Sequence, residues 1–187
     1  TVANVGEKST EATLRKALAV GADDAIRIDT TANDAFYVAA QLAEVAKDYD
    51  LILAGIEASD YNGNAVGGML AEMLDFNSVS AVSGIELEES NFKITREVDG
   101  GSQVISIGGP LVAIVQKGIP KEPRIPAMRG IMMARKKPLS TKEPVEGVNK
   151  TQMISFELPP PKTACKLIDE ENANEVITLL HEEAKVL

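Results

Sequence analysis

Residues 55–68 are better suited to hold a ligand than any other part of this sequence. They follow an uninterrupted apolar run at residues 51–54, and they contain Gly63, Gly67 and Gly68. Glycines let the backbone come close to a bound group, and a helix starting after them would offer unpaired N–H groups to an anion. The stretch has neither the lysine of a P-loop nor the spacing of a dinucleotide fingerprint. Taken alone, it predicts either an anion site or a plain glycine-rich connection.

A second candidate is the basic segment at residues 117–147. It carries eight basic and three acidic side chains, a net charge of +5, which leaves −14 for the rest of a chain whose total is −9. Three methionines lie within it, and methionine is common on surfaces that bind several partners. The charge pattern favours a solvated loop over a docking surface for an acidic partner, and both interpretations stay open at this point.

Two residue types that often carry chemistry are nearly absent. Cys165 is the only cysteine and His181 the only histidine. One residue of each kind cannot build a metal site of several His and Cys ligands, and a hydrolytic triad would depend wholly on His181. We therefore expect no catalytic residue and no metal. A single cysteine also suits a reducing compartment, and we expect a bacterial cytoplasmic protein.

The composition argues against two kinds of partner, nucleic acid and the interior of a membrane. The net charge of −9 argues against nucleic acid, because phosphate repels an acidic surface. No apolar run reaches the roughly 20 residues that a membrane-spanning helix needs. We expect no binding to nucleic acid and no direct insertion into a membrane.

The elements that must position the glycine-rich stretch alternate between strand and helix. Residues 1–5, 25–28 and 51–54 are typical of buried strands, and residues 33–47 carry an apolar stripe at helical spacing. This order predicts an α/β fold with a parallel sheet. Because the chain opens inside a strand, we also expect upstream elements to be missing.

After residue 75 the pattern of residues changes from alternating strands and helices to short strands. Residues 79–82, 92–95, 104–107 and 111–115 are short β-prone runs with turn residues between them, which predicts an antiparallel section. A proline triplet at 159–161 then precedes a helical pattern at about 172–185 and predicts a stiff, extended arm. We expect an α/β domain over residues 1–147 and an arm with a helix over residues 148–187.

Three motifs, taken together and in order, resemble the beta subunits of electron transfer flavoproteins. The family's nucleotide loop, G-x-x-x-x-D-x-x-x-N-x-x-G, is matched by Gly55, Asp60, Asn64 and Gly67. Its R-E-x-D-G-G turn is matched at residues 96–101. Its basic segment is matched by Glu-Pro-Arg at 122–124 and Ala-Arg-Lys-Lys at 134–137. The resemblance runs from Asn4 almost to the C-terminus.

The resemblance implies a Rossmann-like fold of the adenine nucleotide alpha hydrolase type, with helices on both faces of a parallel sheet. It also implies a heterodimer in which an alpha subunit holds most of the FAD and this chain holds AMP, largely through backbone groups. The residues assigned to AMP in this way are Val5, Gly6, Gly55, Ile56, Glu57, Ala58, Ser59, Asp60, Tyr61, Asn62, Gly63, Asn64, Ala65 and Val66.

The basic segment corresponds, by the same resemblance, to a loop that docks flavin dehydrogenases of the acyl-CoA dehydrogenase type. The residues implied are Arg124, Met128, Arg129, Ile131 and Arg135, with Met128 as the apolar anchor where many members have leucine. Glu97 matches an acidic residue that faces the alpha subunit's flavin domain. Electrons would pass on to the membrane enzyme electron transfer flavoprotein–quinone oxidoreductase, as in fatty acid oxidation.

Two alternatives remain. Some family members hold a second FAD in place of AMP and split electron pairs between acceptors, but their loop typically contains D-G-D-T-A-Q-V-G-P, which differs from residues 60–68. A stand-alone adenine-nucleotide-binding protein of similar fold would be a stable monomer. The proline-rich arm favours a protein with a partner subunit.

Overall fold

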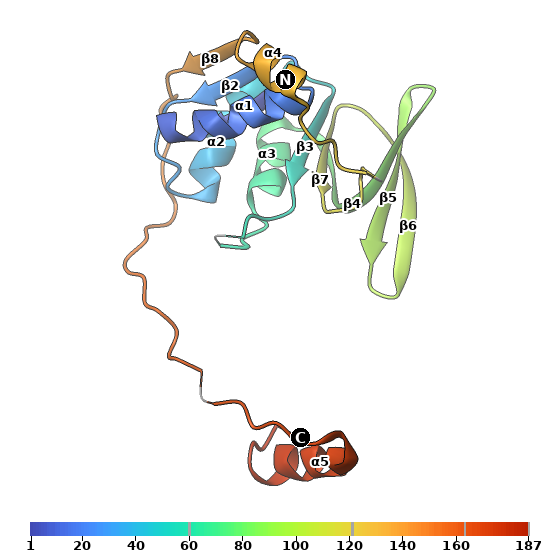
Figure 1. Cartoon of the computed structure of the whole chain (residues 1–187). Coiled ribbons are helices and arrows are strands. Elements are labelled where there is room, and N and C mark those ends of the chain that lie inside the picture. The colour runs from blue at the N-terminus through green and yellow to red at the C-terminus, as the bar shows by residue number, and fades with distance from the viewer. Residues whose placement is uncertain (60, 121, 163, 187) are drawn as a thin grey trace. The chain divides into compact units, whose positions relative to one another are not determined.

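The computed structural model describes residues 1–59, 61–120, 122–162 and 164–186. Its contacts divide the chain into two units, Thr1–Met153 and Ile154–Leu187. Figure 1 labels the helices and strands of both units.

The first sheet of the larger unit contains three parallel strands in the order β1 (Val2–Val5), β2 (Ala25–Ile28) and β8 (Leu139–Lys142). On one face, Leu14 and Leu18 of helix α1 (Glu11–Val20) pack with Ala134 of helix α4 (Met128–Ala134). On the other face, Val45 of helix α2 (Ala35–Ala46) packs on Val5 and Ile28. A short 3₁₀ helix, Lys8–Thr10, leads into α1. Helices therefore cover both faces of this sheet (Figure 1).

The second sheet has five strands in the order β3 (Leu51–Gly55), β7 (Leu111–Val115), β4 (Asn77–Glu88), β5 (Asn91–Val98) and β6 (Gly101–Gly108). The first three are parallel, and the last three form an antiparallel array. Strand β4 belongs to both parts, because residues 77–82 pair with β7 and residues 82–88 pair with β5. Helix α3 (Val66–Leu74) packs on β7 through Ala71.

The structure confirms the predicted fold class, an α/β protein with helix-flanked parallel strands, an antiparallel section and a C-terminal helix. The expectation that residues 111–115 belong to the antiparallel section is wrong, since β7 lies between two parallel neighbours. Leu111, Val112 and Ala113 are each 0% exposed, which is typical of a central parallel strand covered on both faces.

The smaller unit contains a 3₁₀ helix (Glu170–Asn172) followed by helix α5 (Ala173–Glu182). The helix begins close to the predicted start. Its apolar side chains Val176, Leu179 and Leu180 line a shallow space of about 560 Å³ together with Leu167 and Ile168. In neither unit, among the residues described, is any helix both long enough and apolar enough to span a bilayer.

The N-cap residue of α2 and one side chain within this helix hold residues 145–151, near the C-terminal end of the larger unit. The Asp34 carboxylate caps α2 by accepting a hydrogen bond from the Tyr37 N–H (2.7 Å), and it also accepts from the backbone N–H groups of Lys150 and Thr151 (2.8 Å to Thr151). Gln41 exchanges two hydrogen bonds of 2.8 Å with the backbone of Val145. Donation from the Tyr37 N–H, followed by that from Thr151 and Lys150, lowers the pKa of Asp34 below its usual value of 3.8.

The hydrogen bonds that the Asp34 carboxylate accepts, called the Asp34 clamp below, predict that the free energy of unfolding depends on pH. Asp34→Ala should lower the free energy of unfolding by about 2 kcal/mol at neutral pH, since it removes a helix cap and two further hydrogen bonds to a charge. Because the folded state depresses the pKa of Asp34, its contribution is complete above pH 3.8 and is lost as the pH falls through the folded-state value. Urea unfolding of both proteins across acid pH should show the difference shrinking. A difference that stays constant down to the lowest pH would contradict the clamp.

Candidate functional site

The glycine-rich loop lies at the carboxyl end of a parallel strand, as the sequence predicted. Strand β3 ends at Gly55, and the Ile56 N–H donates to the Val115 carbonyl at 2.9 Å, one residue beyond the ladder. Residues 57–59 and 61–64 are exposed, and α3 begins at Val66. Loops in this position bind ligands in open α/β sheets.

The loop is held by its own backbone. The N–H groups of Tyr61 and Asn62 both donate to the Ala58 carbonyl, at 3.3 and 2.8 Å. Asn62 and Asn64 have φ angles of 53° and 42°, in the left-handed region that asparagine tolerates better than most residues. Asp60, which the sequence placed in the site, lies outside the described residues. The Tyr61 side chain is 87% exposed beside it in the sequence.

The start of α3 differs from the sequence expectation. The sequence placed the start of this helix after Gly68, but the helix begins at Val66 and includes Gly67 and Gly68. Its N-cap residue, Ala65, has no side-chain hydrogen bond to the first turn. The N–H groups of this turn therefore have no side-chain cap, which leaves them available to an anion.

Gly67 and Gly68 have opposite surroundings. A Cβ atom on Gly67 would lie 2.8 Å from Cγ1 of Ile114 and 3.3 Å from Cβ of Ala54, so the absence of a side chain lets α3 sit directly on the sheet. A Cβ atom on Gly68 would meet nothing within 4 Å. Gly67 is thus required by packing, whereas Gly68 faces open space next to the loop.

Val5 and Gly6, the other residues assigned to the nucleotide, lie at the end of β1. Val5 is buried in the core under α2. The Gly6 N–H donates to the Ile28 carbonyl, and the Gly6 carbonyl accepts from the Arg27 guanidinium, both at 3.0 Å. Arg27 is 4% exposed, and its hydrogen bond to Asp29, with the nearby charge of Glu11, raises the pKa of Arg27. Both backbone groups of Gly6 are therefore engaged by protein, and its role toward a ligand stays a prediction.

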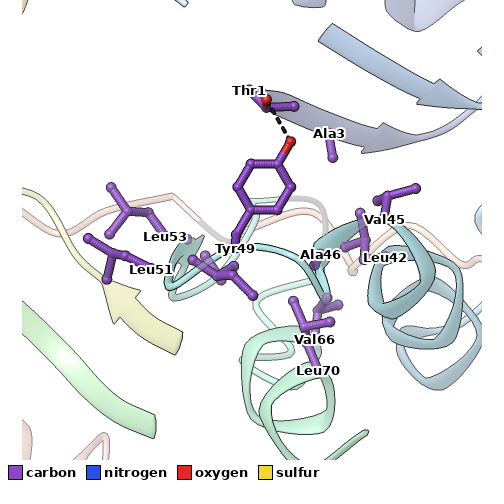
Figure 2. Close-up of a pocket in the computed structure, with 13 residues that line it drawn as sticks. Thr1, Ala3, Leu42, Val45, Ala46, Tyr49, Leu51, Leu53, Val66 and Leu70 are labelled. Atoms are coloured by element: carbon purple, nitrogen blue, oxygen red, sulfur yellow. Dashed lines mark hydrogen bonds between the residues drawn. The ribbon is translucent and has the colours of Figure 1, made fainter. Parts of the chain in front are cut away.

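An apolar groove of about 490 Å³ adjoins the loop (Figure 2). It is lined by residues of β1, α2, β3 and α3 and by the segment between α2 and β3, and it includes Gly55 and Val66 at the two ends of the loop. The Tyr49 hydroxyl crosses the groove and donates to Oγ1 of Thr1 at 2.7 Å. β1 and β3 are edge strands of their two sheets, and among the residues described no charged side chain lines the space between them. The groove suits an apolar or extended occupant better than an anion.

The basic segment forms a second site. In α4, Met128 is 76% exposed, Met132 65% and Ile131 41%, and their spacing places all three on one side of the helix. Arg124, Arg129 and Arg135, at and around this helix, are also exposed. The structure therefore places Met128 and Ile131 on one exposed side of α4, and the three predicted arginines are exposed on or near the same helix. With 76% of its surface exposed, the Met128 side chain does not belong to the core of this unit.

The inner side of α4 is fixed to α1 by contacts that the sequence did not reveal. The Arg15 guanidinium of α1 donates to the carbonyls of Ala134 and Lys137, at 2.7 and 2.8 Å. In return the Lys137 ammonium donates to the carbonyls of Leu18 and Ala22, at 3.1 and 2.5 Å. Each helix thus has one carbonyl of its last turn, and one carbonyl just beyond its end, held by a cation from the other segment, a favourable arrangement for the helix dipole.

Glu97 lies away from both sites, in the antiparallel section. It pairs with Ser102 across β5 and β6 and is exposed. Its neighbour Arg96 turns inward and donates to Oγ of Ser80 at 3.2 Å. The turn that follows contains Gly100 at a φ of 85°, as an Asp-Gly-Gly turn requires. Glu97 is therefore available to a partner, and which partner it faces stays a prediction.

Metal chemistry has no support in the described part of the chain. Among those residues, no three His, Cys, Asp or Glu side chains gather into a possible metal site. Cys165 and His181 are both exposed and belong to the smaller unit.

Comparison with known proteins agrees with this architecture. Residues 1–146 match the model of the electron transfer flavoprotein domain. The chain is 35% identical to electron transfer flavoprotein subunit beta of Bacillus subtilis, over 100% of this chain and 79% of the relative. It is 38% identical to the subunit beta of Syntrophomonas wolfei (91% and 68%), and 34% identical to the human subunit beta (85% and 66%).

The fold defines an α/β protein with a glycine-rich loop at the carboxyl end of a parallel strand. The chain belongs to the family of electron transfer flavoprotein beta subunits. The resemblance inferred from the three motifs is thereby confirmed, and an electron-transfer role follows from the family.

The two neighbouring glycines allow a matched test of how closely α3 packs on the sheet. Gly67→Ala should lower the free energy of unfolding by about 1–3 kcal/mol, because the new methyl group overlaps Ile114. Gly68→Ala should be neutral or stabilising by up to about 1 kcal/mol, because alanine favours the helix and meets no neighbour. Chemical denaturation of both variants measures this. Equal losses at both positions would show that Gly67 is not a packing requirement.

Proposed function

We propose that this chain is the beta half of a heterodimeric electron carrier, with most of the FAD held by an alpha subunit. The family match over residues 1–146 is the observation that carries this proposal. The flavin does the redox work in such a carrier, so this chain needs no acid, base or nucleophile of its own. It acts as a carrier subunit and not as an enzyme.

The glycine-rich loop is the proposed AMP site. The first turn of α3 has N–H groups without a side-chain cap, and Gly68 leaves open space beside them, so a phosphate fits there. The apolar groove that begins at Gly55 and Val66 lies next to the same loop. The contacts would be made largely by backbone groups, which fits a loop whose described side chains point mostly to solvent.

The smaller unit is the proposed attachment to the alpha subunit. Its extended segment carries Ile154, Phe156 and Leu158, which are 84–95% exposed, and Ile177 on α5 is 62% exposed. Apolar side chains at this density are unfavourable in water unless a partner covers them. Prolines 159–161 favour an extended path and lower the entropic cost of holding it.

Removal of residues 154–187 tests this attachment. The larger unit contains all of the buried clusters described above, so the shortened chain should keep its thermal unfolding midpoint. It should no longer co-purify with a tagged alpha subunit, whereas the full chain should. Retention of the heterodimer after the truncation would contradict the proposed attachment.

The exposed face of α4 is the proposed docking site for flavin dehydrogenases of the acyl-CoA dehydrogenase type. Met128 and Ile131 supply apolar surface, and Arg124, Arg129 and Arg135 surround it with positive charge. Such a surface can guide and anchor an acidic partner. From here the electrons would pass through the FAD to electron transfer flavoprotein–quinone oxidoreductase in the membrane.

Met128→Ala should raise the apparent KM of a donor dehydrogenase for the heterodimer about tenfold to a hundredfold, since burying a methionine contributes roughly 1.5–3 kcal/mol. Met128→Leu should be nearly neutral. Met153→Ala is a matched control, because Met153 is 61% exposed but lies outside α4. FAD content should be the same in all three variants. An unchanged KM for Met128→Ala would refute the anchor.

A further inference from the structure

Half of the methionines of this protein lie in one short helix. The chain has six, and Met128, Met132 and Met133 all belong to α4. Their side chains are 76%, 65% and 52% exposed. Methionine sulfur is oxidised according to its accessibility, so these three are more open to a dissolved oxidant than Met69 of α3, which is 37% exposed.

The contacts that hold α4 in place lie on its inner side, away from its exposed methionines. The helix is held from behind by Ala134, which is 3% exposed, by the cations Arg15 and Lys137, and by Gly130, which lies close to the Ala19 carbonyl. None of these contacts uses a methionine sulfur. A chemical change at Met128 or Met132 would therefore alter the outer face of α4 and leave its anchoring intact.

We propose that Met128 and Met132 form a reversible oxidation site that turns dehydrogenase docking off. This inference rests on the docking function proposed above. The oxidant is hydrogen peroxide. Its O–O bond breaks, one oxygen bonds to the thioether sulfur, which gives up two electrons, and the other oxygen leaves as water with both protons. Methionine sulfoxide reductases restore the thioether with two electrons from thiols, and the oxygen leaves as water.

The sulfoxide would convert an apolar anchor into a polar group. Its oxygen is a hydrogen-bond acceptor, and α4 places a cation near it, because Arg129 lies three residues before Met132 on the same helix. Side chains at this spacing are neighbours on a helix surface. The Arg129 guanidinium can donate to the sulfoxide oxygen, which favours the oxidised form and keeps the polar group on the docking face.

The test uses the intact alpha–beta complex treated with hydrogen peroxide. Peptide mass spectrometry should find one added oxygen on Met128 and on Met132 before any on Met69. The apparent KM of the dehydrogenase should rise about tenfold, with FAD content and the thermal unfolding midpoint unchanged. Treatment with methionine sulfoxide reductase should restore the KM. Oxidation at both residues with no change in KM, or no oxidation at either, would overturn the proposal.

The double variant Met128→Leu/Met132→Leu is the matched control, because leucine keeps the apolar volume without an oxidisable sulfur. Its KM, measured before and after treatment, should be insensitive to peroxide, and a peroxide-induced rise equal to that of wild type would place the effect elsewhere and overturn the proposal. Met153→Leu should remain as sensitive as wild type. If the docking role itself is wrong, untreated Met128→Ala will show an unchanged KM. If only the oxidation site is wrong, that variant will show a raised KM while peroxide has no effect.

Discussion

The exposed surface of α4 depends on hydrogen bonds that cations exchange between α1 and the segment that contains α4 and Lys137. Arg15 holds carbonyls in and just after the last turn of α4, and Lys137 holds the corresponding carbonyls at the end of α1. Gly130 lets the two helices approach, since a Cβ atom there would lie 2.6 Å from the Ala19 carbonyl oxygen. These contacts let a seven-residue helix, too short to be stable alone, present Met128 to solvent in a fixed orientation. The same segment then continues into β8 and joins the first sheet.

A second close approach positions helix α3 at the end of the glycine-rich loop. Gly67 lets α3 rest on Ile114 and Ala54, which places the uncapped first turn of the helix at the carboxyl end of β3. The next residue, Gly68, has no neighbour to accommodate. Gly67 thus serves packing, and Gly68 faces open space. The apolar groove between β1 and β3 begins at the ends of this loop and extends the open region along α2.

The sequence predicted the elements whose pattern is local and missed those that depend on partners. Strand β2 and helix α2 lie close to their predicted bounds, because their apolar periodicity is strong. Strand β8 was not anticipated: it is short, mostly exposed and polar in part, and only its pairing with β2 defines it. The parallel pairing of β7 is set by distant neighbours. Motifs pointed to Met128 and to the loop, but Lys137 read as one more basic residue, since its capping role depends on carbonyls more than a hundred residues away.

The central claim is that this chain is the beta half of an alpha–beta electron carrier and holds AMP in its glycine-rich loop. The nucleotide content of the purified alpha–beta complex tests both parts of this claim most directly. The complex would be denatured, and the released nucleotides quantified by mass spectrometry. The account predicts AMP and FAD in equal amounts, with AMP lost selectively when Gly68, which faces open space at the start of α3, is replaced by leucine. FAD as the only nucleotide would contradict the AMP assignment in favour of a bifurcating subunit. The absence of a stable complex with an alpha subunit would contradict the account as a whole.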